Sequence, residues 1–151
     1  MNSLDYAAEA RALLTLGRGS LGSLAERDGL AYPFVSLVLP ALSAESEPIL
    51  LLSDLSDHAK NLQRDPRASL LLDGTLELKE PLTGPRLTLL GEVRLSADRQ
   101  ADQTRYLARH PSAELYAGFG DFRLYRFRIL EGLFVAGFGR IFRLRPEEFK
   151  A

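Results

Sequence analysis

The segment from about residue 86 to 96 constrains the fold most strongly, because its hydrophobic and polar residues alternate. One face of an extended strand would carry the apolar residues Leu87, Leu89, Val93 and Leu95. The other face would carry the polar residues Arg86, Thr88, Glu92 and Arg94. This division predicts a half-buried strand in an antiparallel sheet, since strands of parallel sheets are apolar on both faces. Gly91 indicates a bulge or the close approach of another backbone.

Shorter runs predict four further strands, at residues 19–26, 33–39, 48–53 and 67–73. Asp28-Gly29 lies between the first two runs and is typical of a hairpin turn. The segment FRLYRFRILEGLFVAGFGRIFRLRP, which begins at Phe122, predicts two or three more strands joined at Glu131-Gly132.

Helices are predicted over residues 4–16, 56–64 and 98–109, the last with Ser96 as its N-cap, and a second short helix follows the proline at position 111. These helices do not alternate regularly with the strands, whereas a doubly wound parallel sheet needs a crossover helix for each strand pair. The sequence therefore predicts an α+β fold with a mainly antiparallel sheet or barrel.

The chain has 151 residues, the size of one domain, so a single domain over residues 1–151 is expected. Hydrophobic residues make up 46% and charged residues 26%, which is typical of a globular protein and not of a disordered one. No apolar run approaches the roughly 20 residues that span a bilayer. The first residues lack the basic region of a secretory signal, and cysteine is absent. We therefore expect a cytoplasmic protein with no membrane partner.

The basic residues are mostly arginines and lie late in the chain, although the net charge is only −1. Six arginines fall between Arg123 and Arg145. Two interpretations stay open: recognition of an anionic ligand or acidic partner, for which the planar guanidinium is suited, or a salt-bridged surface. The near-neutral total and the lack of a recognised motif disfavour a nucleic-acid role.

Common catalytic signatures are absent from the sequence, including GxSxG, HExxH, the Walker loop and GxGxxG. His58 and His110 are the two histidines, so no metal site built from several histidines is predicted. His110 precedes a proline at the end of a predicted helix, where a structural or surface role is expected.

The turn from Ser53 to His58 is the most informative polar segment, because a predicted strand runs there into a predicted helix. Unpaired N–H groups and the positive end of the helix dipole favour an anion such as phosphate at that position. The alternative is ordinary capping, in which Ser or Asp side chains accept those N–H groups. Ser36 and Arg86 are weaker candidates. The alternatives are a buried serine bonded to the backbone and an arginine that faces water at a strand entrance.

Five segments, in order along residues 10–145, resemble a known family. They are AYPFVS, SDLSDHAKNLQRDPRASLL, PRLTLLG, YAGFGDFRLYRF and AGFGRI. Together they are similar to the pyridoxamine 5′-phosphate oxidase-related, FMN-binding split-barrel superfamily, and most similar to its haem-utilisation branch.

The resemblance implies a six-stranded split β-barrel with flanking helices, and a homodimer with FMN at the dimer interface. Residues beside the flavin ring or ribityl chain would be Pro33, Phe34, Val35, Ser36 and Ser53. Residues at the strand-to-helix turn, near the phosphate, would be Ser56, His58 and Asn61. Arg86 would occupy a polar strand position that reaches the ribityl chain or phosphate. The pocket would be closed by Asp121, Phe138 and Gly139.

By this resemblance we expect a flavin-binding oxidoreductase-like protein, with FMN as its cofactor and a small molecule as electron donor or acceptor. One alternative is a haem-binding or haem-degrading protein of the same superfamily. The other is a dimeric interaction module without a cofactor. The sequence leaves catalysis itself undecided.

Overall fold

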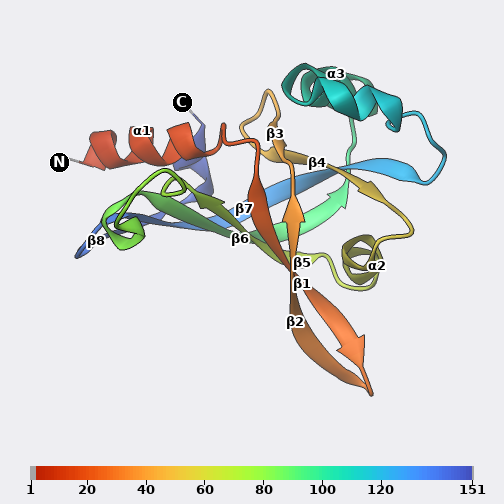
Figure 1. Ribbon diagram of the computed structural model, residues 1–151, viewed down its shortest axis with the longest axis horizontal. Coiled ribbons are helices and arrows are strands. Elements are labelled where there is room, and N and C mark those ends of the chain that lie inside the picture. Colours follow the sequence, from red (N-terminus) through yellow and green to blue (C-terminus); the bar gives the residue numbers. More distant parts are fainter. Residues whose placement is uncertain (1–2, 151) are drawn as a thin grey trace.

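The computed structural model describes residues 3–150, and within them eight strands form one sheet in which every strand pair is antiparallel (Figure 1). The strands are β1 (Gly19–Arg27), β2 (Leu30–Val38), β3 (Ala41–Leu42), β4 (Pro48–Ser53), β5 (Arg67–Asp73), β6 (Arg86–Leu95), β7 (Phe122–Gly137) and β8 (Arg140–Leu144). The helices are α1 (Ser3–Leu13), α2 (Asp57–Arg64) and α3 (Arg99–Arg109), with 3-10 turns η1 (Pro81–Thr83), η2 (Pro111–Leu115) and η3 (Pro146–Phe149). The predicted α+β fold with an antiparallel sheet is confirmed.

The sheet runs in the order β2-β1-β5-β6-β7-β4-β3, and β8 pairs with the second half of β7. It does not close into a barrel, because β2 pairs only with β1 among the described strands. At the other end of the path β4 pairs with β3 only through Pro48 and Ile49, so its edge from Leu50 to Ser53 carries no strand of the described chain. We call the open boundary between β2 and β4 the seam.

The hairpin of β1 and β2 projects beyond the rest of the sheet (Figure 1). Asp28 and Gly29 form its turn with φ angles of 53° and 77°, the left-handed values that a tight two-residue hairpin turn requires. The predicted turn is confirmed, and β2 begins at Leu30, three residues before the expected start, because the tight turn pairs Arg27 directly with Leu30. Pro33 is accommodated because β2 is an edge strand.

The sixteen-residue strand β7 corrects one prediction, because no turn occurs at Glu131-Gly132. The strand runs through these residues while β6 pairs along its length, and β4 and β8 pair with its first and second halves. The turn comes instead after Gly137, where Gly139 has a φ of 70°. A register shift between Leu90 and Gly91 confirms the predicted bulge, and a side chain at Gly91 would overlap the carbonyl oxygen of Arg128.

The helices begin and end close to their predicted positions, with one correction at α3. Its N-cap is Asp98, whose carboxylate accepts the Ala101 N–H at 3.3 Å, and not Ser96. The Ser96 hydroxyl instead donates to Asp102 within the helix, at 2.6 Å. No helix in residues 3–150 is long and apolar enough to cross a membrane.

The main core fills the concave side of the sheet, with Leu21, Leu50, Leu70, Leu89 and Phe127 fully buried in it. A smaller cluster lies between α3 and the outer side of β4 and β7. It consists of the buried residues Ala41, Ile49, Tyr106, Ala113 and Leu124. Helix α3 therefore covers the sheet beside the seam.

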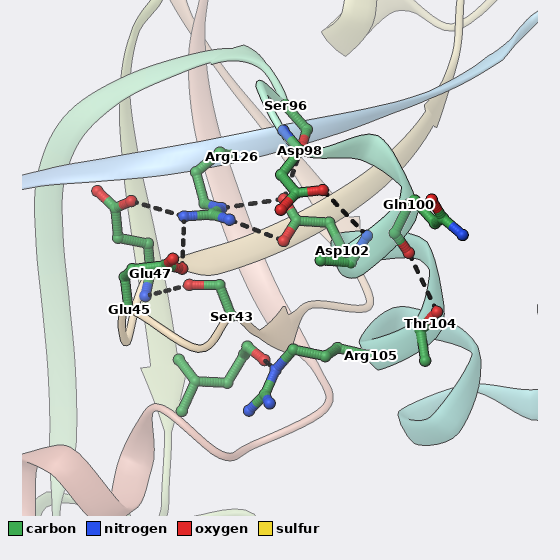
Figure 2. A network of polar contacts seen from close by, with 12 residues as sticks. Ser43, Glu45, Glu47, Ser96, Asp98, Gln100, Asp102, Thr104, Arg105 and Arg126 are labelled. Carbon is green, nitrogen blue, oxygen red and sulfur yellow. Dashed lines mark hydrogen bonds and ion pairs between the residues drawn. The ribbon is translucent and has the colours of Figure 1, made fainter.

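A charged network fixes α3 to the sheet (Figure 2). Arg126 on β7 donates to the buried Asp102 of α3 at 2.7 Å, and to Glu47 and Glu45 of the β3–β4 loop at 3.0 and 3.2 Å. Hydrogen bonds to these carboxylates raise the pKa of Arg126 against the opposing effect of burial, so the guanidinium stays charged.

Replacing Arg126 with Met should lower the free energy of unfolding by about 3 kcal/mol, because Asp102, with 2% of its side chain exposed, loses its countercharge. Urea denaturation measures the change. The matched control is Arg143→Met, whose ion pair with Glu131 is exposed and whose loss should cost no more than about 0.5 kcal/mol. Equal losses in the two variants would contradict the assigned role of the network.

Candidate functional site

In the turn between β4 and α2, the free backbone groups bind side chains of the turn itself. The Ser56 hydroxyl accepts the Ala59 N–H at 3.3 Å and donates to the carbonyl oxygen of Ser53 at 2.7 Å. Asp57 lies in the first helical turn, where a carboxylate complements the helix dipole. Of the two interpretations of this turn, the capping one describes Ser56, which has no free hydroxyl hydrogen left for a ligand.

Ser53 and Asp121 hold the same turn to the start of β7. The Ser53 hydroxyl donates to the Asp121 carboxylate at 2.6 Å and accepts the Leu55 N–H at 3.1 Å. The Asp54 N–H donates to the carbonyl oxygen of Asp121 at 2.7 Å, and the Asp54 carboxylate pairs with Arg123. The structure thus brings Ser53, Ser56 and Asp121 together, through contacts that the sequence did not predict.

Ser36 and His58 meet across the seam. Ser36 lies on β2, His58 lies in the first turn of α2, and Ser36 Oγ and His58 Nδ1 are 2.8 Å apart. This contact is the hydrogen bond that joins β2 directly to α2 in the described chain. Burial lowers the pKa of His58 below its ordinary value, although neighbouring Asp57 acts in the opposite direction. The imidazole is therefore neutral at pH 7.

A cleft of about 380 Å³ follows the seam and contains Ser53, Ser56 and His58 in its wall. The rest of its lining is mainly apolar or aromatic. The exposed and half-buried apolar or aromatic members are Leu37, Leu39, Leu51, Tyr116 and Phe122, and the buried Tyr106 adds a third aromatic ring. A mainly apolar cleft with few polar groups is typical of a site for a flat organic ligand.

Other predicted residues lie around α2 but outside this cleft. Pro33 and Phe34 line a second hollow, of about 640 Å³, between the β1–β2 hairpin and α2. Val35 points to the outer face of the sheet and is 71% exposed. Asn61 is buried, donates to Ser23 at 3.1 Å and also accepts from Arg64, so in this chain it joins α2 to β1.

Arg86, Phe138 and Gly139 lie at the opposite end of the sheet from α2. Arg86 pairs with Asp73 at the far end of β5, about 20 Å along that strand from Arg67, which begins β5 three residues after the end of α2. Its guanidinium donates to the carbonyl oxygens of Leu82 and Gly84. One protomer therefore does not bring these three residues to the Ser53–His58 turn, and their cofactor role stays a prediction.

Sequence reasoning did not identify the aromatic wall of the cleft, which comes from Tyr106 in α3, Tyr116 after η2 and Phe122 in β7. Two of these, Tyr116 and Phe122, belong to the YAGFGDFRLYRF segment, which carried part of the resemblance. That segment was the sequence signal from which these two residues could have been identified. Tyr106 gave no signal of its own, because an aromatic residue on a helix is most often part of a core.

The open antiparallel barrel with a cleft at its seam is the split-barrel fold of pyridoxamine 5′-phosphate oxidase-related proteins. A Clostridium acetobutylicum protein of the pyridoxinephosphate oxidase family, related to general stress protein 26, has this fold with a TM-score of 0.71 at 14% identity, over 98% of this chain and 99% of that one. The family model described as the CREG β-barrel matches residues 2–151, and the chain belongs to that family.

Two further relatives carry names that refer to haem. The chain is 36% identical over 126 residues to the chloroplastic non-canonical heme oxygenase HOZ of Arabidopsis thaliana, a match that covers 80% of this chain and 38% of that protein. It is 27% identical to a heme binding protein of Mycobacterium smegmatis with a TM-score of 0.85, over 99% of this chain and 60% of that one. The chain thus spans less than two thirds of the length of each of these two relatives.

The His58 ring should titrate with a midpoint below 6.5 in an NMR pH titration, because burial favours its neutral form. Asp57→Asn should lower the midpoint further, since the carboxylate acts to raise it. Because the pKa is lower in the folded than in the unfolded chain, His58 contributes stability above pH 6.5 that is lost as the pH falls through the lowered value. A midpoint at or above 6.5 would show that the ring is not desolvated.

Proposed function

We propose that this chain binds haem in the seam cleft between β2 and β4. The observation that carries the proposal is the cleft itself, in which a half-buried histidine stands in a wall of leucine and aromatic side chains. Such a wall suits the flat apolar face of a porphyrin, and imidazole is a common protein ligand of haem iron. The residues present therefore fit the group.

The surroundings of the cleft favour haem over FMN. A phosphate needs free donors and cations, yet the Ser53 and Ser56 hydroxyls already donate within the chain. Asp57 occupies the helix N-terminus where the phosphate would lie, and Asp121 adds another carboxylate beside the turn. Two like-charged groups nearby raise the cost of binding an anion. FMN-dependent oxidoreduction remains the alternative that the resemblance predicts.

The names of two relatives support the same ligand, since one is called a haem oxygenase and the other a haem-binding protein. Bound haem supplies a redox-active iron, and the chain supplies its orientation and the surroundings of the metal. In this proposal the leucines and aromatic rings of the wall exclude water from the porphyrin face, and the Ser36–His58 contact holds the imidazole in place. Haem breakdown, named for the Arabidopsis relative, is a further possibility for the same site.

We further propose that the outer face of the sheet is covered by a second copy of the chain. Leu37, Leu71 and Leu90 stand on that face of β2, β5 and β6, with 59%, 37% and 48% of each exposed. Ser20 of β1 pairs with both Leu37 and Leu71, so these three side chains lie in one row across β2, β1 and β5. Leu90 lies on the same face of the neighbouring strand β6. An exposed apolar row of this kind marks an interaction surface, and a two-fold dimer buries the same patch on both copies.

Titrating the purified protein with haem and, separately, with FMN tests the ligand. We expect a saturable shift of the Soret band for haem, and weak or absent perturbation of the flavin spectrum. A saturable flavin signal without a haem signal would favour the oxidoreductase alternative. Failure to bind either molecule would overturn the proposed function and favour a cofactor-free module. In the haem-loaded protein, bleaching of the Soret band with a reductant in air would separate breakdown from simple binding.

Leu90→Arg should convert the dimer to a monomer, because a charge buried without a partner at an interface costs several kcal/mol. Sedimentation equilibrium measures the change. The control is Leu115→Arg, which places the same charge on a residue that is 80% exposed and lies in η2, outside the strands β2, β5 and β6 that carry the apolar patch. A wild-type monomer, or a dimer that survives Leu90→Arg, would contradict the proposed interface.

A further inference from the structure

The chain offers few groups that can ligate a haem iron. It contains no cysteine, its single methionine is Met1, and its two histidines are His58 and His110. Haem iron in proteins is held by His, Cys, Met or Tyr side chains. The choice of ligand within this chain therefore lies mainly between two imidazoles and the tyrosines of the cleft.

His110 is engaged elsewhere. It caps the end of α3, and its Nε2 donates to the carbonyl oxygen of Pro40 at 2.8 Å. Its ring also packs against that of Tyr106, with the centroids 5.0 Å apart. His110 does not belong to the wall of the seam cleft, whereas His58 does.

The tyrosines of the cleft are less suited to the iron. Tyr106 donates its hydroxyl to the carbonyl oxygen of Leu39 at 2.7 Å, so a ligating phenolate there would break a hydrogen bond that holds α3 to the end of β2. Tyr116 packs its ring against that of Phe122, with the centroids 4.8 Å apart.

The contact between Ser36 and His58 has the form that orients a metal-binding imidazole. A histidine that ligates a metal through one ring nitrogen usually donates from the other to a fixed acceptor, which sets the ring orientation. Nδ1 of His58 is 2.8 Å from Ser36 Oγ. In the tautomer in which Nδ1–H donates to Ser36, the lone pair of Nε2 is free for a ligand.

We propose that His58 Nε2 is the protein ligand of the haem iron, and that Ser36 on the opposite side of the seam is the positioning residue that fixes its ring. This inference rests on the proposed haem binding and names the iron ligand within the same site. It places the iron beside the first turn of α2, at the wall of the cleft that contains His58.

Pulsed electron paramagnetic resonance of the ferric haem complex tests the ligand directly. The protein is made with histidine labelled with the heavy nitrogen isotope, and haem alone is the probe. Coupling of the labelled nitrogen to the iron should appear in the wild type and in His110→Gln, and should be absent in His58→Gln. Gln at position 58 keeps a polar side chain opposite Ser36, and circular dichroism confirms that each variant is folded.

The outcomes separate this inference from the proposed function. Coupling that persists in His58→Gln and disappears in His110→Gln would overturn the assignment of His58. Haem binding by the wild type without any labelled-nitrogen coupling would also overturn it, while leaving haem binding intact. A wild type that does not bind haem would overturn the proposed function itself.

Ser36→Ala tests the positioning residue. Loss of such an orienting partner weakens metal binding by about 10- to 100-fold, so haem affinity should fall by at least about tenfold. The labelled-nitrogen coupling should remain but with an altered size, because the ring is still present and its orientation is no longer fixed. An unchanged coupling and affinity would remove Ser36 from the site.

Discussion

The sheet of this protein stays open between β2 and β4, and side chains rather than strand pairing hold that seam together. Ser36 bonds to His58 of α2, while Tyr106 and His110 of α3 donate to the backbone carbonyls at the end of β2. The bonds from Tyr106 and His110 satisfy the carbonyl oxygens of Leu39 and Pro40, which follow β2 and pair with no strand of the described chain. The seam is thereby spanned at a few points, and the space between those points is the cleft.

The position of α3 therefore bears on the site as well as on stability. Arg126 and the buried Asp102 tie that helix to β7, and the same helix contributes Tyr106 to the cleft wall. On the other side of the seam, Asp121 holds the turn that precedes α2 through Ser53. Charged groups outside the cleft thus fix both walls, on one side through Ser53 of the wall itself, and the lining stays largely apolar.

Much of this fold follows from local sequence patterns, whereas the site depends on contacts between distant segments. The alternation that begins at residue 86, the Asp28-Gly29 turn and the Gly91 bulge are local signals that the structure confirms, except that Leu95, predicted on the apolar face, is 59% exposed. The turn predicted at Glu131-Gly132 is wrong because Gly132 lies inside β7, where the Phe149 ring packs closely against it. Only the tertiary structure shows this contact. The Ser36–His58 pair joins residues 22 positions apart, so no spacing rule predicts it.

A crystal structure of the haem complex tests the account most directly, because it locates the porphyrin and the iron ligand together. The account predicts the porphyrin in the seam between β2 and β4, with the iron within bonding distance of His58 Nε2 and Nδ1 still hydrogen-bonded to Ser36. A porphyrin bound near Arg86 and the β7–β8 turn, or an iron ligated by any other residue, would contradict it.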